Sequence, residues 1–385
     1  MNLINRRSFL VNSGLLAGGL ASGFRFPASK ETDEELKSLQ STVKFIRDGI
    51  DMSPLEYSWE LYQMAKENKI EIDYYSNGGS VEELEKKFAS LLGKESAIFM
   101  PTGTLANHIA IRKLAGKRKR VIVQSDSHIY RDSGDCTQNL SGLNPIPVQA
   151  GKYSFTLADV LQVVEKNSAN KVKTPIGAIS IESPVRRHNN QAFPFEEMKK
   201  ISDYARSRNI GMHLDGARLF NASAHSGILP HQYAELFDTV YISMYKDFNA
   251  PSGAILAGSR EFTKDLYHTR RMFGGGMSQV WTFAVIALKY ADSFLENYKL
   301  AIQNADQLFS LLNKNSNLQF EHIPNGTNVF NLYIKGTDPK KFRSALLKEQ
   351  IVLPAPTENK FNMKLNVTVN RKTPEWIAQK FKEAL

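Results

Sequence analysis

The sequence contains a single cysteine, Cys136, among its 385 residues. One thiol can form no intramolecular disulfide and can supply no cysteine-based metal site. A lone cysteine is usually a small buried hydrophobic side chain, so Cys136 is not a candidate nucleophile. The composition therefore predicts neither a disulfide framework nor a metal centre.

Clusters of basic residues are also scarce, although the formal net charge is +10. The one dense run, Lys117–Arg120, directly precedes a strand-like stretch and is typical of a solvated turn. A nucleic-acid surface requires a basic stripe with interleaved aromatic residues, which this sequence lacks. We therefore predict no nucleic-acid partner, while the positive field favours an anionic cofactor or substrate.

No apolar run reaches the length of a membrane span. The N-terminus has Arg6 and Arg7, then a short stretch rich in apolar and small residues up to about Gly23. This order is typical of an export signal, and the arginine pair resembles the twin-arginine type. The alternative is an amphipathic helix with a coincidental arginine pair. We expect residues 1–29 to be the signal and the mature protein to be periplasmic without a membrane segment. The protein would remain cytoplasmic if the signal does not function.

Helix-like and strand-like segments alternate from about residue 80 to residue 260. Helices are expected at 81–92, 104–114, 157–165 and 196–208, and strands at 97–100, 121–123, 176–181, 210–214, 240–243 and 254–257. This alternation predicts an α/β fold in which helices cover a mostly parallel sheet. In such folds ligands bind beyond the carboxyl ends of the strands.

The chain is long enough for two domains. We expect an N-terminal arm and a large domain over residues 30–289, and a smaller α+β domain over 290–385. A long helix is predicted at 280–296. In the small domain, strands are predicted at 329–334 and 365–369, and helices at 339–349 and 374–384.

Polar residues follow several of the predicted strands. Thr102, Gly103 and Thr104 come directly after the strand at 97–100 and open a helix. Free N–H groups at a helix start, with a glycine that permits close approach, can hold a phosphate group. The alternative is that Thr102 is simply an N-cap.

Three further strands are followed by His128, by Asp215 with Arg218, and by Lys246. Each has an ordinary explanation when taken alone, such as a structural Asp–Arg pair or a surface lysine. Together with the phosphate cradle, they supply the groups that pyridoxal 5'-phosphate (PLP) requires. These are a stacking ring, a carboxylate that keeps the pyridine nitrogen protonated, and a lysine that binds the aldehyde.

Five stretches carry a resemblance to a known family: LEKKFASLLGKESAIFMPTGTLANHIAI, DSHIY, HLDGARLFNASAHSGI, YKDFNAPSGAILAGSREF and RRMFGGGMSQ. From about Asp73 to Leu385 the sequence resembles the threonine aldolases and β-eliminating lyases among the fold type I (aspartate aminotransferase-like) PLP enzymes. The resemblance implies a homodimer or homotetramer that acts on a small amino-acid substrate.

The resemblance also implies roles for the residues at the strand ends. Thr102–Thr104 would hold the phosphate, and His128 would stack on the pyridine ring. Asp215 would contact the ring nitrogen, and Arg218 would lie near the ring hydroxyl or the substrate carboxylate. Lys246 would carry the cofactor.

The substrate side departs from the family pattern. Asp48 stands where a family serine helps to bind the substrate carboxylate, and an aspartate there would repel that group. Lys364 stands where an arginine is expected to clamp the carboxylate, and lysine cannot reproduce the bidentate fork. Ser278 and Val185 replace a family arginine and histidine, and Arg186 and Arg187 follow Val185.

The expected function is cleavage of a β-hydroxy-α-amino acid to glycine and an aldehyde, with Lys246, His128 and Asp215 as catalytic residues. The general base stays open between His128, Asp132 and a bound water. Asp48, Arg186, Arg218 and Lys364 are the candidates for substrate binding. The alternatives are β-elimination, transamination or decarboxylation of another amino acid, or a non-catalytic relative with the same fold.

Overall fold

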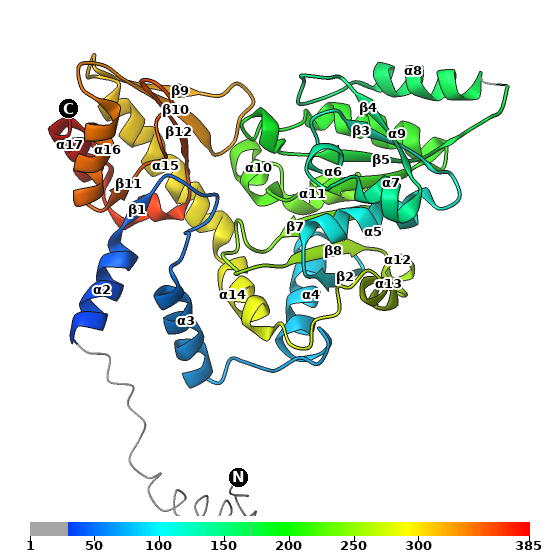
Figure 1. Ribbon diagram of the computed structural model, residues 1–385, viewed down its shortest axis with the longest axis horizontal. Coiled ribbons are helices and arrows are strands. Elements are labelled where there is room, and N and C mark those ends of the chain that lie inside the picture. Colours follow the sequence, from blue (N-terminus) through cyan, green and yellow to red (C-terminus); the bar gives the residue numbers. More distant parts are fainter. Residues whose placement is uncertain (1–29, 170) are drawn as a thin grey trace, which may run out of the picture. The chain divides into compact units, whose positions relative to one another are not determined.

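The computed structural model describes residues 30–169 and 171–385. The predicted export signal, at residues 1–29, lies outside the described residues. The chain divides into two units, residues 1–40 and residues 41–385. The described part of the first unit, residues 30–40, belongs to helix α2 (Lys30–Ser41), and the second unit carries the sheets (Figure 1).

A seven-stranded sheet is the centre of the second unit. Its strand order is β2 (Ser96–Met100), β8 (Ala254–Gly258), β7 (Thr239–Ser243), β6 (Gly211–Asp215), β5 (Ile176–Glu182), β3 (Arg120–Gln124) and β4 (Asn144–Val148). Strand β8 pairs antiparallel with β2 and β7, and all other neighbours are parallel. Every strand except β8 therefore points in the same direction, which confirms the predicted fold class.

Strand β4 was not predicted, because its sequence contains Pro145 and Pro147. Proline has no N–H group to donate within a sheet, so it is confined to positions such as edge strands. Strand β4 is the edge strand of this sheet and pairs only with β3.

The strands are buried on both faces, which explains their uninterrupted apolar sequences. Phe99 and Ile242 belong to the core that also contains apolar residues of α4 and α9. Ile98 and Tyr241, their neighbours in sequence, belong to the core beneath α5 on the other face. Figure 1 shows these helices flanking the green strands.

The helices agree with most of the predicted ranges. They are α3 (Pro54–Lys66), α4 (Gly79–Leu91), α5 (Gly103–Ala115), α6 (His128–Arg131), α7 (Cys136–Ser141), α8 (Leu157–Ser168), α9 (Phe195–Ser207), α10 (Leu219–Ser226), α11 (Pro230–Glu235), α12 (Arg260–Thr263), α13 (Leu266–Met272), α14 (Trp281–Ala291), α15 (Phe294–Leu312), α16 (Pro339–Lys348) and α17 (Pro374–Glu383), with 3₁₀ turns η1 (Arg186–His188) and η2 (Val367–Arg371). The single helix predicted at 280–296 is wrong. Helix α14 packs on α3 and α4, whereas α15 packs on α10 and α17. The helical conformation is interrupted between them, at residues 292–293.

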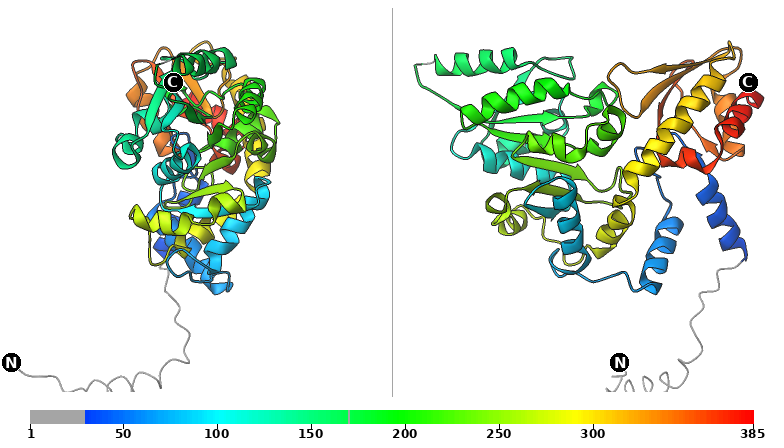
Figure 2. Two further views of the ribbon diagram at one scale, coloured as in Figure 1. Left: turned by 90° about the vertical axis from the view of Figure 1, so that its right-hand side faces the viewer. Right: turned by 180° about the vertical axis from the view of Figure 1, so that it is seen from behind.

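A second, antiparallel sheet has the order β12 (Lys360–Lys364), β10 (Val329–Ile334), β9 (Leu318–His322). The strand predicted at 365–369 is wrong, because β12 ends at Lys364. The side chain of Asn366 accepts a hydrogen bond from the N–H group of Thr368 (2.9 Å) and starts the η2 turn there. Helix α15, yellow in Figure 2, lies against elements of this C-terminal part, among them β9 and α17.

The segment that follows α2 joins the C-terminal elements. Strand β1 (Val43–Lys44) pairs in parallel with β11 (Ile351–Val352). This pairing brings the loop after β1 next to the end of β12, where the N–H of Lys364 donates to the carbonyl of Phe45 (2.9 Å). The domain boundary at residue 289 stays a prediction.

The described ranges lack two features. No helix there is both long enough and apolar enough to cross a membrane. The same residues contain no cluster of histidine, cysteine, aspartate and glutamate side chains that could hold a metal ion.

Candidate active site

The carboxyl ends of the like-directed strands open into a cavity of about 840 Å³. All of the site residues singled out from the sequence line it: Asp48, Thr102, Gly103, Thr104, His128, Arg186, Asp215, Arg218, Lys246 and Lys364. Residues separated by up to 316 positions therefore share one site. Asp132 also lines this cavity, whereas Arg187 is not among its lining residues.

The loop between β2 and α5 has the form expected of a phosphate cradle. Thr102 is the N-cap of α5, and its hydroxyl accepts the N–H of Leu105 (3.2 Å). A Cβ atom at Gly103 would overlap the hydroxyl oxygen of Tyr241, so only glycine allows the helix to begin here. The N-cap explanation and the phosphate explanation are thus compatible, because the first backbone N–H groups of α5 remain available to an anion.

Asp215 ends β6 and is held by a chain of buried polar groups. Its Oδ2 accepts Nδ2–H of Asn107 (2.5 Å), and the Oδ1 atom of Asn107 lies 2.8 Å from Nε2 of His213. Nδ1 of His213 lies 2.8 Å from the hydroxyl of Thr239. Burial lowers the pKa of His213 to about 4, so the ring is neutral. Because a carboxylate only accepts, this chain fixes the orientation of the Asn107 amide and of Asp215.

Lys246 lies three residues beyond the end of β7 and is partly buried. Burial lowers its pKa to about 8, and the positive charge of Arg218 acts in the same direction. The loop after β1 lies directly against it, because a Cβ at Gly49 would overlap the carbonyl oxygen of Lys246. Asn249 fixes this contact by accepting the N–H of Ile50 (2.7 Å).

His128 begins α6, and its backbone N–H donates to Oε2 of Glu182 (2.6 Å). Burial lowers the pKa of His128, while the nearby carboxylate of Asp215 opposes this effect. The imidazole of His128 is neutral at neutral pH, because burial keeps its pKa below the usual value. Burial and then Asp215 raise the pKa of Glu182 to about 7. Nδ1 of His128 lies 3.3 Å from the hydroxyl of Ser133.

Asp132 is held by two arginines. Arg187 forms two hydrogen bonds with its carboxylate (2.6 and 3.2 Å), and Arg186 forms one (2.5 Å). The hydrogen bonds from Arg187, and then those from Arg186, keep the pKa of Asp132 below its usual value. The carboxylate of Asp132 is therefore already engaged by two arginines in this structure.

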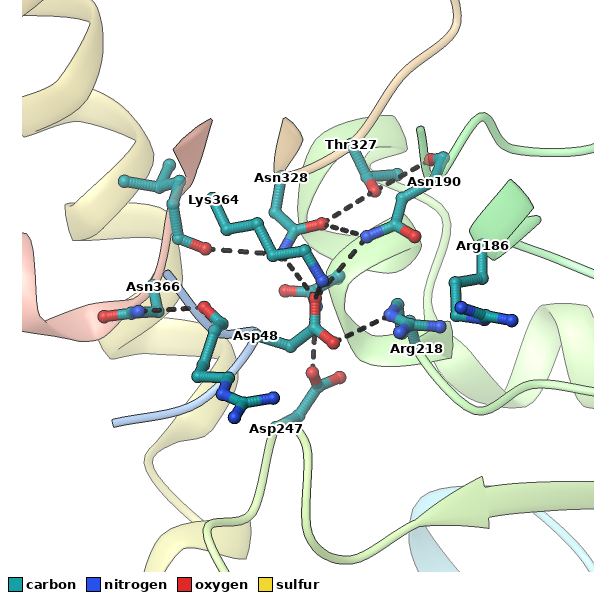
Figure 3. A network of polar contacts seen from close by, with 12 residues as sticks. Asp48, Arg186, Asn190, Arg218, Asp247, Thr327, Asn328, Lys364 and Asn366 are labelled. Carbon is teal, nitrogen blue, oxygen red and sulfur yellow. Dashed lines mark hydrogen bonds and ion pairs between the residues drawn. The ribbon is translucent and has the colours of Figure 1, made fainter. Parts of the chain in front are cut away.

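Asp48 lies between the two cations expected to bind the substrate (Figure 3). Its Oδ2 accepts Nε–H of Arg218 (3.0 Å), and its Oδ1 accepts Nζ–H of Lys364 and Nδ2–H of Asn328 (both 3.1 Å). Burial acts to raise the pKa of Asp48, but Arg218 and Lys364 outweigh it and hold that pKa well below its usual range. Asp48 is thus a buried, ionised carboxylate.

Glu182, Asn107 and His213 support the site, but the sequence predicted no role for them. Glu182 ends β5 in the same way that Asp215 ends β6, so its place at a strand end was a usable signal. His213 lies two residues before Asp215 on one strand, and therefore on the same face. Asn107 gave no signal, because only the packing of α5 on the sheet brings it to Asp215.

The donor set of the cavity fits PLP. A helix N-terminus suits its phosphate, the carboxylate of Asp215 suits its ring nitrogen, and the amine of Lys246 suits its aldehyde. The glycine at position 103 leaves space beside Tyr241 that any other residue would fill.

Known proteins are similar to this chain in sequence and in fold. The β-eliminating lyase family matches residues 61–331. A low-specificity L-threonine aldolase of Candida albicans is 31% identical over 229 residues, which are 58% of this chain and 60% of that protein. The chain thus spans about 60% of the length of such curated relatives.

Two solved structures are similar across most of the chain. A putative L-allo-threonine aldolase of Listeria monocytogenes has a TM-score of 0.73 and 25% identity, over 92% of this chain and 98% of that one. Serine palmitoyltransferase of S. paucimobilis, solved with bound PLP, has a TM-score of 0.61 and 15% identity, over 89% and 86%. The second likeness shows the fold alone. With the family match over residues 61–331, these findings imply dependence on PLP, and the chain belongs to the β-eliminating lyase family of fold type I enzymes.

Proposed function

We propose that the protein is a PLP-dependent lyase that cleaves the Cα–Cβ bond of a β-hydroxy-α-amino acid to give glycine and an aldehyde. The observation that carries this proposal is the meeting of Lys246, Asp215, His128 and the start of α5 around one cavity. The threonine aldolases among the relatives support the choice of reaction.

Bound PLP supplies an aldehyde for an amine and an aromatic ring that accepts the electrons of a bond to Cα. The first N–H groups of α5 would hold its phosphate. Asp215 would hold a proton at the ring nitrogen, and the Asn107–His213 chain behind it keeps the carboxylate in place. Lys246 would provide the amine that anchors the cofactor.

His128 is the base that takes the proton from the β-hydroxyl group. Its ring is neutral because burial lowers its pKa, so a ring nitrogen can accept that proton. Asp132, the other candidate side chain for the general base, is engaged by Arg186 and Arg187. Glu182 positions His128 through the backbone N–H group of that residue.

Purified protein with PLP should release an aldehyde and glycine from threonine, allo-threonine or phenylserine, measured by a coupled aldehyde assay. His128→Asn should lower kcat by about 10²–10⁴-fold while PLP stays bound, because general-base catalysis is lost. Lys246→Ala serves as the inactive control. If none of the three substrates, as the free acid or as the carboxamide, gives an aldehyde, or if pyruvate, ammonia or CO₂ forms in place of glycine, the proposed reaction is wrong.

The titration of Lys246 should govern cofactor uptake. Only the neutral amine attacks an aldehyde, and the pKa of Lys246 is lowered to about 8. The rate of PLP uptake by apoprotein should therefore rise with pH, reach half its maximum near pH 8 and level off above it, as followed by absorbance. A free lysine side chain, with a pKa of about 10.4, is the control. An uptake rate that keeps rising up to about pH 10.4, the pKa of the free lysine, would show that burial does not lower the pKa of Lys246.

The proposal also includes assembly as a homodimer or homotetramer. It further includes a small-molecule substrate and no nucleic-acid partner. Ile72, Tyr74 and Met272 are 68%, 75% and 64% exposed, and these exposed apolar side chains are the candidates for contact with a second copy. Light scattering should give two or four times the mass of the chain, and Ile72→Asp should lower it. A monomer at micromolar concentration would rule out this assembly.

Export through a twin-arginine signal to the periplasm is the proposed localisation, and Arg6 and Arg7 support it. A reporter fused after residue 29 should be exported, and the double change Arg6→Lys, Arg7→Lys should retain it in the cytoplasm. Cell fractionation measures both. Equal cytoplasmic retention of the unchanged and the changed fusion would contradict export.

A further inference from the structure

Nearly all positive side chains of the cavity form ion pairs with carboxylates of the chain itself. Ion pairs join Arg47 to Asp51 (3.6 Å), Arg186 to Asp132 (2.5 Å), Arg218 to Asp48 (3.0 Å) and Lys364 to Asp48 (3.1 Å). Among the described lysine and arginine side chains that line the cavity, only Lys246 has no carboxylate within 4 Å. Lys246 is assigned to the cofactor, so a substrate carboxylate finds no unpaired cation.

The pairing at Asp48 differs from the other two in its burial. The side chains of Asp48 and Arg218 are 8% and 4% exposed, whereas Arg47 and Arg186 lie at 71% and 46%. Exposed ion pairs contribute little, whereas separating a buried pair is costly because it leaves a buried charge without its partner. The Asp48 pair therefore controls what can bind between Arg218 and Lys364.

Asp48 is also held in place by neutral groups and by its backbone. Besides the two cations, its Oδ1 accepts hydrogen bonds from Asn328 (3.1 Å) and from Asn190 (3.5 Å). Asn190 in turn donates to Asn328 (2.7 Å), as Figure 3 shows. The carbonyl of Arg47 accepts Nδ2–H of Asn366 (3.0 Å), which fixes the loop one residue before Asp48.

We propose that Asp48 is a specificity-determining residue that fills the anion position between Arg218 and Lys364, so that the site prefers substrates whose carboxyl group carries no charge. The preferred substrate class is β-hydroxy-α-amino acid amides or esters rather than the free acids. This inference rests on the proposed function and deepens it by naming the form of the substrate.

The physical reason is competition for the same donors. A free carboxylate entering this position would meet the charge of Asp48 and would have to share Arg218 and Lys364 with it, and like charges in one site disfavour each other. Asp48 stays ionised, because its cationic neighbours hold its pKa well below the usual range. A carboxamide avoids the repulsion, since its N–H group can donate to Asp48 and its carbonyl can accept from a cation. Specificity of this kind uses a repulsive element against the wrong ligand.

Threonine and threoninamide make a matched pair, because they differ by the exchange of one carboxylate oxygen for NH₂. Holoenzyme is titrated with each, and the dissociation constants are taken from the change in cofactor absorbance and from calorimetry. Threoninamide should bind at least about tenfold more tightly, which corresponds to about 1.4 kcal/mol. Equal or tighter binding of threonine overturns the proposal, and this measurement on the unchanged protein requires no variant.

Asp48→Asn should remove the discrimination and lower the threonine-to-threoninamide ratio of dissociation constants by at least about tenfold. Asp48→Ser tests the same point with a smaller side chain if the first variant folds poorly. Asp135→Asn is the control, because it removes an exposed charge outside the cavity and its backbone (φ 51°) suits asparagine. It should leave the ratio unchanged. A ratio that stays constant in the Asp48 variants, or that falls equally in Asp135→Asn, overturns the assignment.

The two proposals fail separately. If both ligands bind with the expected preference but neither releases an aldehyde, the lyase function is wrong and the assignment of Asp48 stands. If threonine is cleaved and binds at least as tightly as threoninamide, the lyase function stands and the assignment of Asp48 is wrong.

Discussion

The common direction of the strands in the central sheet is the constraint on which the site depends. Strands β2, β3, β5, β6 and β7 end along one edge, so residues at the end of each strand, or within four positions after it, line the same cavity. The helices buried against both faces hold this edge rigid. The one antiparallel strand, β8, pairs with β7, so the connection over residues 244–253, which contains Lys246, begins and ends at this edge. Chemistry-bearing side chains from distant positions therefore meet without long loops.

Burial at this edge affects each ionisable group according to its neighbours. It lowers the pKa of Lys246 to about 8 and raises that of Glu182 to about 7, because neither group has a close opposite charge that compensates for the lost water. Asp48 is buried as well, yet its pKa falls because two cations contact it directly. The same cavity thus holds a lysine that is readily neutralised beside a carboxylate that remains charged.

The two sides of the cavity are built differently. The cofactor side consists of residues at the ends of neighbouring strands, each placed by its own strand. The substrate side combines the loop after β1, the N-cap of α10 and the end of β12, and it is closed by the contacts of Asp48 with Arg218 and Lys364. This side joins segments far apart in the chain. Its residues can therefore be substituted without any change to the groups that are predicted to hold PLP.

The sequence by itself determined the fold class and predicted which residues would hold the cofactor. Both depend on local patterns, namely apolar runs of strand length and a polar residue at or shortly after the end of each run, as at Asp215 and Lys246. It also indicated that Asp48 disfavours a substrate carboxylate. Only the tertiary structure decided that Asp48 is an ion-pair partner of Arg218 and Lys364, that Asn107 and His213 support Asp215, and that the chain turns at Asn366 instead of continuing as a strand. These features depend on contacts between segments distant in sequence, and the pairing of β1 with β11 and the packing of α5 on the sheet create those contacts.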